Sequence, residues 1–240
     1  MSWTKVVFVF LFVGVQIKGF LAPGGHPRVN ILALGDETSG DVREVYRNPV
    51  AQAFSTFIKP SNVSSAGVVD LDSIDWSCRK RKKTSLRRLS DDLCRALKQR
   101  EWFVTGNVDP KFFSNDFYFQ DPDVATAGGV EVYARGVAKI FSPGTRAEVI
   151  KSEVDDGASM LTVTWRIEGR VSIGPRGLPI KPFLVFSDLM VDENGLITSQ
   201  QDRFSIPGWD IFLSAIFPFT IGKLTAPPAL SASQLSDLEG

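Results

Sequence analysis

A carboxyl group within an apolar strand is the feature of this chain best suited to proton chemistry. Asp188 lies in the run 183–191, where the two-residue period of a strand places it on one face with apolar neighbours. Removal from water disfavours the charged carboxylate and raises its pKa toward the range of a general acid or base. The neighbours on that face are Leu184, Phe186 and Met190.

Two tyrosines could assist Asp188, and two arginines could instead neutralise it. In an enzyme hypothesis, Asp188 is the catalytic carboxyl and Tyr118 or Tyr133 is its partner in proton transfer. The alternative is a structural ion pair of Asp188 with Arg166 or Arg203. We favour the ion pair, because buried charges are normally paired.

The sequence lacks the residues that other common catalytic and cofactor sites require. The only histidine, His26, lies in the N-terminal targeting region, so we expect no Ser-His-Asp, Cys-His or histidine-based metal site in the domain. There is no glycine-rich phosphate loop or dinucleotide motif. Asp121 and Asp123 flank a proline, and a turn explains them better than a cation site does. Cys78 and Cys94 are interpreted as unpaired thiols rather than a redox pair. We therefore expect no metal and no cofactor.

Aromatic side chains are dense enough to line a pocket for a small lipophilic molecule. Taken singly, each of these residues is more often ordinary core. The polar groups that orient a ligand would come from one of two strand faces, either Gln201 with Arg203 or Gln200 with Asp202. The expected pocket residues are Phe117, Phe119, Trp165, Phe186, Met190, Gln201 and Arg203.

The charges of the chain balance, with 27 basic and 27 acidic residues. No overall field would attract nucleic acid, and no nucleic-acid partner is expected. The basic run RKRKK at 79–83 is interpreted as a solvated linker that leads into the first helix. Contact of this run with an anionic membrane surface is the alternative.

The N-terminus is predicted to be a targeting segment. Residues 1–19 are expected to form a signal peptide, because Lys5 precedes the apolar run 6–15, which is too short to span a membrane. Phe20 then leads Leu-Ala-Pro, which resembles the bipartite presequences of plastid proteins in algae with complex plastids. Plastid residence is therefore expected, with secretion or endomembrane residence as the alternative.

The remaining chain divides into three parts. Residues 20–80 are interpreted as a transit peptide and disordered linker. Residues 84–222 are expected to form the folded domain with its apolar C-terminal segment, and residues 223–240 a flexible tail.

Three helical segments are predicted ahead of the strands. Leucines recur at helical spacing over 85–100, and Ser85 is the expected N-cap. Asp109 followed by proline starts a second helix that ends near Ser114. A third helix fits 130–141.

Period-two alternation then predicts three long strands. Apolar and polar residues alternate over 161–168, and the run 183–191 is almost continuously apolar. The hairpin turn 192–195 returns the chain as the strand 196–204. We expect antiparallel neighbours joined by short turns, without parallel crossovers.

This order of elements resembles the nuclear-transport-factor-2-like superfamily, and within it the SnoaL-like group, closest to a plastid branch. The resemblance covers residues 85–205 and rests on WFVTGNVDPKFFSNDFYFQDP, GGVEVYARGVAKIF, LTVTWRIEG, FLVFSDLMV and LITSQQDRF. It implies an α+β fold in which a cone-shaped, curved antiparallel sheet packs against about three N-terminal helices. Isomerases of the superfamily use a pocket carboxylate with a tyrosine. Its other members include cyclases, dehydratases, pigment-binding domains and scaffolds, so the fold does not select a function.

The apolar segment 206–222 is interrupted by Pro207 and Pro218 and is too short between them to cross a bilayer. Packing against the domain as a lid or helix is the interpretation we favour. Docking of a protein partner, or peripheral membrane contact through the stretch from Trp209 to Phe219, is the alternative.

The leading functional hypothesis is a non-catalytic plastid protein that binds a small lipophilic molecule or serves as a scaffold in thylakoid-associated assembly. The alternative is a cofactor-free SnoaL-like isomerase or hydrolase that uses a pocket carboxylate. A third hypothesis is an interaction module that forms a homodimer through its open sheet.

Overall fold

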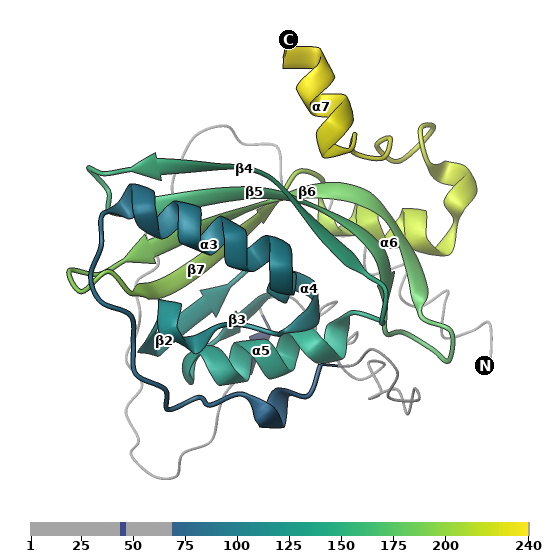
Figure 1. Cartoon of the computed structure of the whole chain (residues 1–240). Helices are drawn as coiled ribbons and strands as arrows, with labels where there is room; N and C mark the ends of the chain where they lie inside the picture. Colours follow the sequence, from purple (N-terminus) through teal and green to yellow (C-terminus); the bar gives the residue numbers. More distant parts are fainter. Residues whose placement is uncertain (1–43, 47–68, 240) are drawn as a thin grey trace. The chain divides into compact units, whose positions relative to one another are not determined.

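The computed structural model describes residues 44–46 and 69–239. Within these residues, seven strands form one curved, open sheet in the order β1-β3-β2-β7-β6-β5-β4 (Figure 1). The strands are β1 (Glu44–Tyr46), β2 (Phe113–Gln120), β3 (Val124–Thr126), β4 (Arg146–Asp155), β5 (Met160–Val171), β6 (Leu178–Val191) and β7 (Ile197–Phe204).

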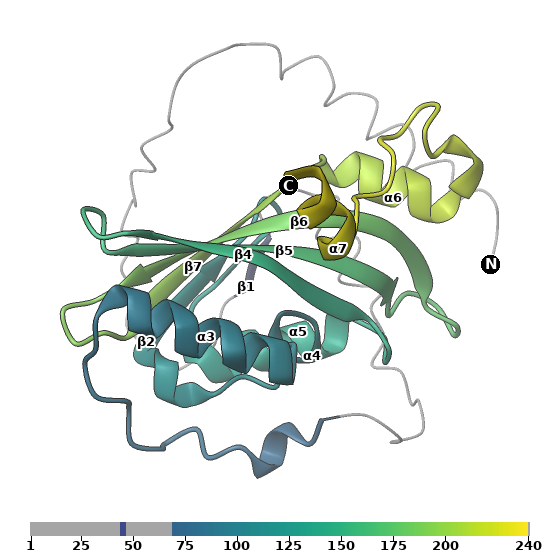
Figure 2. The same ribbon diagram turned by 45° about the horizontal axis from the view of Figure 1, so that its top comes forward.

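Helices lie on both sides of the sheet. Figure 2 shows α3, α4 and α5 on one side, which we call the inner face, and α6 and α7 on the other side, the outer face. The helices are α3 (Leu86–Arg100), α4 (Trp102–Thr105), α5 (Gly129–Ile140), α6 (Gly208–Ile216) and α7 (Ala232–Glu239), and the 3-10 turns are η2 (Leu71–Ser73), η3 (Pro110–Phe112) and η4 (Pro218–Thr220).

The predicted α+β fold is confirmed, and local capping explains where its helices begin. The Ser85 hydroxyl accepts a hydrogen bond from the Arg88 N–H and so caps α3. Asp109 accepts from the Lys111 N–H ahead of Pro110, but only a single 3-10 turn follows. The second predicted helix is therefore one turn long, because the chain becomes extended at Phe113.

Two features of the sheet differ from the prediction. The aromatic segment after η3 is itself a strand, β2, and it pairs in parallel with β7, so the expectation of antiparallel neighbours alone is wrong for this pair. The other pairs in the sheet are antiparallel. The edge strand β4 was also not predicted, because its mixed exposed and half-buried residues give no strong alternation.

The structure describes two parts of the predicted linker 20–80. Strand β1 pairs with β3, and the 3-10 turn η2 lies within residues 69–80, most of which have no regular secondary structure. The predicted signal peptide, Phe20 and His26 lie outside the described residues. The predicted tail 223–240 contains α7.

The core fills the space between the inner face and the helices α3, α4 and α5. Of the leucines at helical spacing on α3, Leu89, Leu93 and Leu97 are buried and Leu86 is half-buried. Gly106 allows α4 to approach α5, since its φ is +72° and a Cβ at this position would lie 2.3 Å from the Ala134 carbonyl oxygen.

Candidate functional site

A chain of hydrogen-bonded polar side chains lies on the inner face of the sheet. Trp165 Nε1 donates to Ser187 Oγ at 2.9 Å, and Ser187 Oγ donates to Asp202 Oδ1 at 2.6 Å. Gln200 Nε2 donates to the same Asp202 oxygen at 2.9 Å and to the Tyr133 hydroxyl at 3.4 Å. These five residues are called the interior network.

Strand register places the interior network. Ser187 on β6 pairs with Asp202 on β7, and Leu189 pairs with Gln200. Because side chains alternate between the faces, these four residues all point to the inner face. Tyr133 enters from α5 on the same side.

Burial controls the electrostatics of the interior network. Removal from water raises the pKa of Asp202 to about 7, although hydrogen bonds from Ser187 and Gln200 oppose the shift. Burial, and then the negative charge of Asp202, raises the pKa of Tyr133 well above its usual value. Among the described residues, no cation forms an ion pair with Asp202. This carboxyl can therefore hold or release a proton near neutral pH.

One acceptor of the interior network lacks a partner. Gln200 Oε1 is buried and receives no hydrogen bond. A buried acceptor without a donor costs about 1–3 kcal/mol, so a bound donor group at this point would be stabilising. Asp202 keeps 8% of its surface exposed, whereas Ser187 and Gln200 keep 0% and 1%, so Asp202 is the member of this hydrogen-bonded trio nearest to solvent.

Aromatic rings surround the interior network. The rings of Phe119 and Phe117 lie 4.8 and 5.6 Å from that of Tyr133, and Phe103 stacks on Trp165 at 4.8 Å. The site therefore combines one titratable carboxyl with an apolar surrounding.

Asp188, the candidate carboxyl from the sequence, lies on the outer face. Its oxygens accept from Arg203 Nε at 2.9 Å and Arg203 Nη2 at 3.1 Å, and from Thr162 Oγ1 at 2.8 Å. The favoured ion pair with Arg203 is thus confirmed, while Arg166 pairs with Glu168. The prediction of an apolar environment for Asp188 is wrong. The alternate residues of β6, such as Ser187 and Leu189, face the core, and Asp188 points to the opposite side.

The predicted pocket residues divide between the two faces. Phe117, Trp165 and Tyr133 are buried on the inner side and Phe119 is half-buried. The following predicted residues instead face outward and are half-buried or exposed: Tyr118, Phe186, Met190, Gln201 and Arg203. Of the two polar sets that the sequence left open, Gln200 with Asp202 joins the aromatic residues, and Gln201 with Arg203 does not.

The remaining candidates have structural roles. Asp121 Oδ1 accepts from the backbone N–H groups of Asp123 and Val124 at 2.7 and 2.6 Å, which confirms the predicted turn. Cys78 and Cys94 are free thiols, as predicted. Across the described parts of the chain, no group of three or more His, Cys, Asp or Glu residues is arranged to hold a metal ion.

The apolar C-terminal segment packs on the outer face, as the favoured interpretation predicted. Lys181 of β6 forms a buried ion pair with Asp210 of α6. Lys181 Nζ also donates to the Ala226 carbonyl at 2.6 Å, and the Ala226 N–H donates to Asp210 Oδ2 at 2.7 Å. Trp209 and Phe219 nevertheless remain 43% and 72% exposed. None of the helices in the described residues has the length and apolarity of a membrane span.

Comparison with known proteins finds solved structures that are similar to about half of this chain. No family model matches the sequence, and no curated protein matches it. An NTF2-like protein of unknown function from Cytophaga hutchinsonii is 17% identical, covers 52% of this chain and 94% of its own, and has a TM-score of 0.35. An LEH-like epoxide hydrolase from M. tuberculosis is 17% identical over 54% of this chain and 90% of its own, with a TM-score of 0.40.

A protein assigned as a SnoaL-like polyketide cyclase from Jannaschia sp. CCS1 is 13% identical. It covers 57% of this chain and 96% of its own, with a TM-score of 0.44. At these identities the similarity concerns the fold and not the chemistry.

Proposed function

We propose that the inner face of the sheet binds a small, mainly apolar molecule whose one polar end contacts the interior network. The observation that carries this proposal is the unpartnered Gln200 Oε1 beside Asp202, within a ring of aromatic side chains. Because Gln200 and Phe117 are each 1% exposed, the side chains that cover them would move apart on binding. A ligand hydroxyl would then donate to Gln200 Oε1, and its apolar body would contact Phe117 and Phe119. Plastid residence, inferred from the presequence that Phe20 leads, is part of the same proposal.

Two adjacent glutamines provide a matched test. The chain is purified from its native compartment and extracted with organic solvent, and the retained molecules are identified by mass spectrometry. Gln200→Leu should lose the retained molecule, because Leu lacks the acceptor. Gln201→Leu, on the outer face, should keep it. A wild-type protein that retains nothing, or equal retention by both variants, would contradict the binding proposal.

Proton transfer is the second candidate, and the pKa of Asp202 near 7 favours it. A carboxyl with this pKa is present in both protonation states at neutral pH and can act as acid or base. Asp202 replaces Asp188 in this hypothesis, and Tyr133 is the tyrosine that remains close.

The proton-transfer hypothesis is tested with a panel of unsaturated ketones and epoxides in D₂O, followed by NMR. Asp202→Asn should abolish turnover of any panel member that the wild type converts, and Asp188→Asn should leave the rate unchanged. Conversion at the wild-type rate by Asp202→Asn would rule out Asp202 as the catalytic group.

For the partner, we propose peripheral membrane contact of the C-terminal segment. Phe219 and Leu224 are 72% and 71% exposed, and Lys223 is the only charged residue between Asp210 and Asp237 in the sequence. Exposed apolar side chains beside a lysine favour binding to an anionic bilayer surface. Co-sedimentation with phosphatidylglycerol vesicles should be lost in a Phe219→Ser, Leu224→Ser double variant and kept in Met190→Ser. Equal sedimentation of all three would count against this contact.

A further inference from the structure

The basic run 79–83 is docked against the domain. The Arg81 N–H donates to the Lys111 carbonyl at 3.2 Å, and Lys80 Nζ donates to the Pro110 carbonyl at 3.2 Å. The interpretation of this run as a solvated linker is therefore wrong for Lys80 and Arg81, while Arg79, Lys82 and Lys83 are exposed to solvent. The backbone of the run is fixed beside η3, and it contributes to one wall of a groove.

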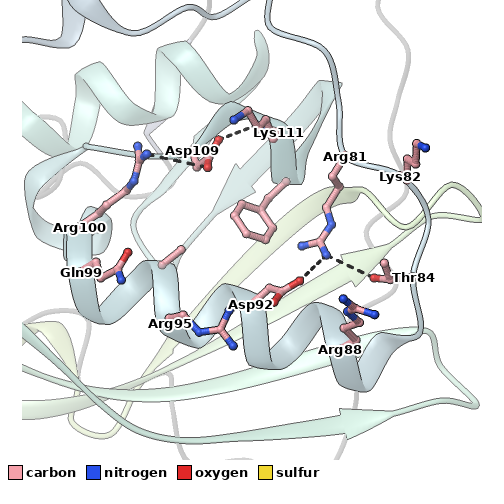
Figure 3. Close-up of a pocket in the computed structure, with 12 residues that line it drawn as sticks. Arg81, Lys82, Thr84, Arg88, Asp92, Arg95, Gln99, Arg100, Asp109 and Lys111 are labelled. Carbon is pink, nitrogen blue, oxygen red and sulfur yellow. Dashed lines mark hydrogen bonds and ion pairs between the residues drawn. The ribbon is translucent and has the colours of Figure 1, made fainter.

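Arg81 crosses this groove to α3 (Figure 3). Its guanidinium donates to Asp92 Oδ2 at 2.7 Å and lies 4.8 Å from the centre of the Phe112 ring. The side chain is only 14% exposed, and its Nε–H is buried without an acceptor. A buried guanidinium donor without a partner is costly, and an anion in the groove would offer it an acceptor.

The groove has a volume of about 470 Å³ and is open to solvent. Its walls come from residues 81–84, one side of α3, and the segment around η3. Six cationic and two acidic side chains line it, in a chain whose charges balance overall. The cations are Arg81, Lys82, Arg88, Arg95, Arg100 and Lys111, and the acids are Asp92 and Asp109.

The two acids are already engaged. Asp92 accepts from Arg81 and, at 3.2 Å, from Arg95, and the hydrogen bond from Arg81 lowers the pKa of Asp92. Asp109 lies 3.9 Å from Arg100. Within the described residues, the remaining cations Lys82, Arg88 and Lys111 form no ion pair. Positive charge is thus left over on all three walls.

We propose that this groove binds a small molecule that carries two or more phosphoryl groups. Guanidinium groups form paired hydrogen bonds with phosphate oxygens, and lysines add point charges. The volume falls within the range of small-molecule sites, about 300–1,000 Å³. The Phe112 ring and Ala96 supply an apolar floor for the rest of the molecule. The phosphoryl groups can belong to a soluble compound or to a phospholipid headgroup.

The test is calorimetric titration of the full chain with inorganic tripolyphosphate at constant ionic strength. Saturable binding is expected, and a Lys82→Gln, Arg88→Gln double variant should bind about tenfold more weakly or worse, the effect of losing one charge-assisted contact. Both side chains are exposed and unpaired, so the fold should survive, which circular dichroism checks. A Lys139→Gln, Arg176→Gln double variant, which changes the net charge equally at two exposed residues outside the groove, should bind like the wild type.

A parallel titration with phosphatidylcholine vesicles, with and without phosphatidylinositol bisphosphate, identifies the source of the phosphoryl groups. Groove-dependent binding to these vesicles alone would assign the site to a lipid headgroup. The proposal is overturned if neither probe binds, or if the control variant loses as much affinity as the groove variant.

Discussion

Asp188 and Asp202 lie on adjacent strands, β6 and β7, but on opposite faces of the sheet. On the outer face, the Arg203 guanidinium holds Asp188 through two hydrogen bonds. On the inner face, the donors to Asp202 among the described residues are the neutral groups of Ser187 and Gln200, and burial raises its pKa to about 7. The two carboxyls therefore differ in their partners, since a guanidinium contacts Asp188 and neutral groups contact Asp202.

A third carboxyl extends this contrast. Asp210 is as deeply buried as Asp202, but it contacts the ammonium group of Lys181. The buried carboxyl of Asp210, paired with Lys181, stabilises the packing of α6 on the sheet. A buried carboxyl without a cation is costly to retain, so its presence is a sign of function.

We expect the strongest effect from removing the cation beside Asp210. Lys181→Met should lower the free energy of unfolding by about 3–5 kcal/mol, because the carboxylate is left buried and unpaired. Urea denaturation measures the loss, and Lys223→Met on the exposed part of the same segment is the control. If Lys181→Met unfolds like the control, the two buried carboxyls do not differ in the way proposed.

Asp202 should give the protein a specific pH dependence. Its folded pKa of about 7 lies above the ordinary value of 3.8, so the folded state binds more protons between these values. The free energy of unfolding should therefore fall by about 4 kcal/mol in total as the pH rises from below 3.8 to above 7, and this contribution should become constant about one pH unit above the folded pKa.

The stability of Asp202→Asn relative to the wild type should rise over the same pH interval, since Asn does not titrate. Urea denaturation at several pH values measures this difference, and Asp188→Asn is the matched control. An unchanged difference between pH 4 and 7 would mean that Asp202 titrates at an ordinary pKa.

Ser187→Ala should remove an uncharged hydrogen-bond donor from Asp202 without changing an ion pair. The carboxyl loses one donor and Trp165 Nε1 loses its acceptor, so we expect a loss of about 1–3 kcal/mol in stability. The pKa of Asp202 should rise further, which a carbon-13 NMR titration of the side chain measures. A fall in that pKa would show that Ser187 does not stabilise the charged form.

The weakest effect is expected on the outer face. Arg203→Gln should cost about 0–1 kcal/mol, because the Arg203 side chain is 55% exposed and water screens the pair. Added salt should reduce the difference from the wild type in thermal unfolding. A loss as large as that of Lys181→Met would place Asp188 with the buried carboxyls.

Local patterns in the sequence were sufficient for α3, α5 and the strands β5, β6 and β7. Leucine spacing over α3, the alternation in β5, and the turn 192–195 each depend on neighbours within a few residues. Strand β2 and its parallel pairing with β7 could not be predicted this way, because they join segments about 80 residues apart. Strand β1 has the same difficulty, since three residues give no periodicity.

The candidate site was partly predictable. The two-residue period of a strand correctly separated Gln200 and Asp202 from Gln201 and Arg203, but it did not predict which of the two sets faces inward. In β6 both parities carry apolar residues, so the sequence gives no sign of which side is buried. Leu184, Phe186 and Met190 suggested the wrong face, and the helices that cover the other side decided the outcome.

The amino-acid order alone therefore set α3, α5 and the three long strands β5, β6 and β7, together with the two alternative faces of each of these strands, because these follow from backbone geometry over short distances. Only the packed fold decided that Asp202 is buried without a cation while Asp188 meets Arg203, and that the run 79–83 forms a wall of a groove. Burial and charge pairing depend on which distant segments pack together, and no local pattern contains that information.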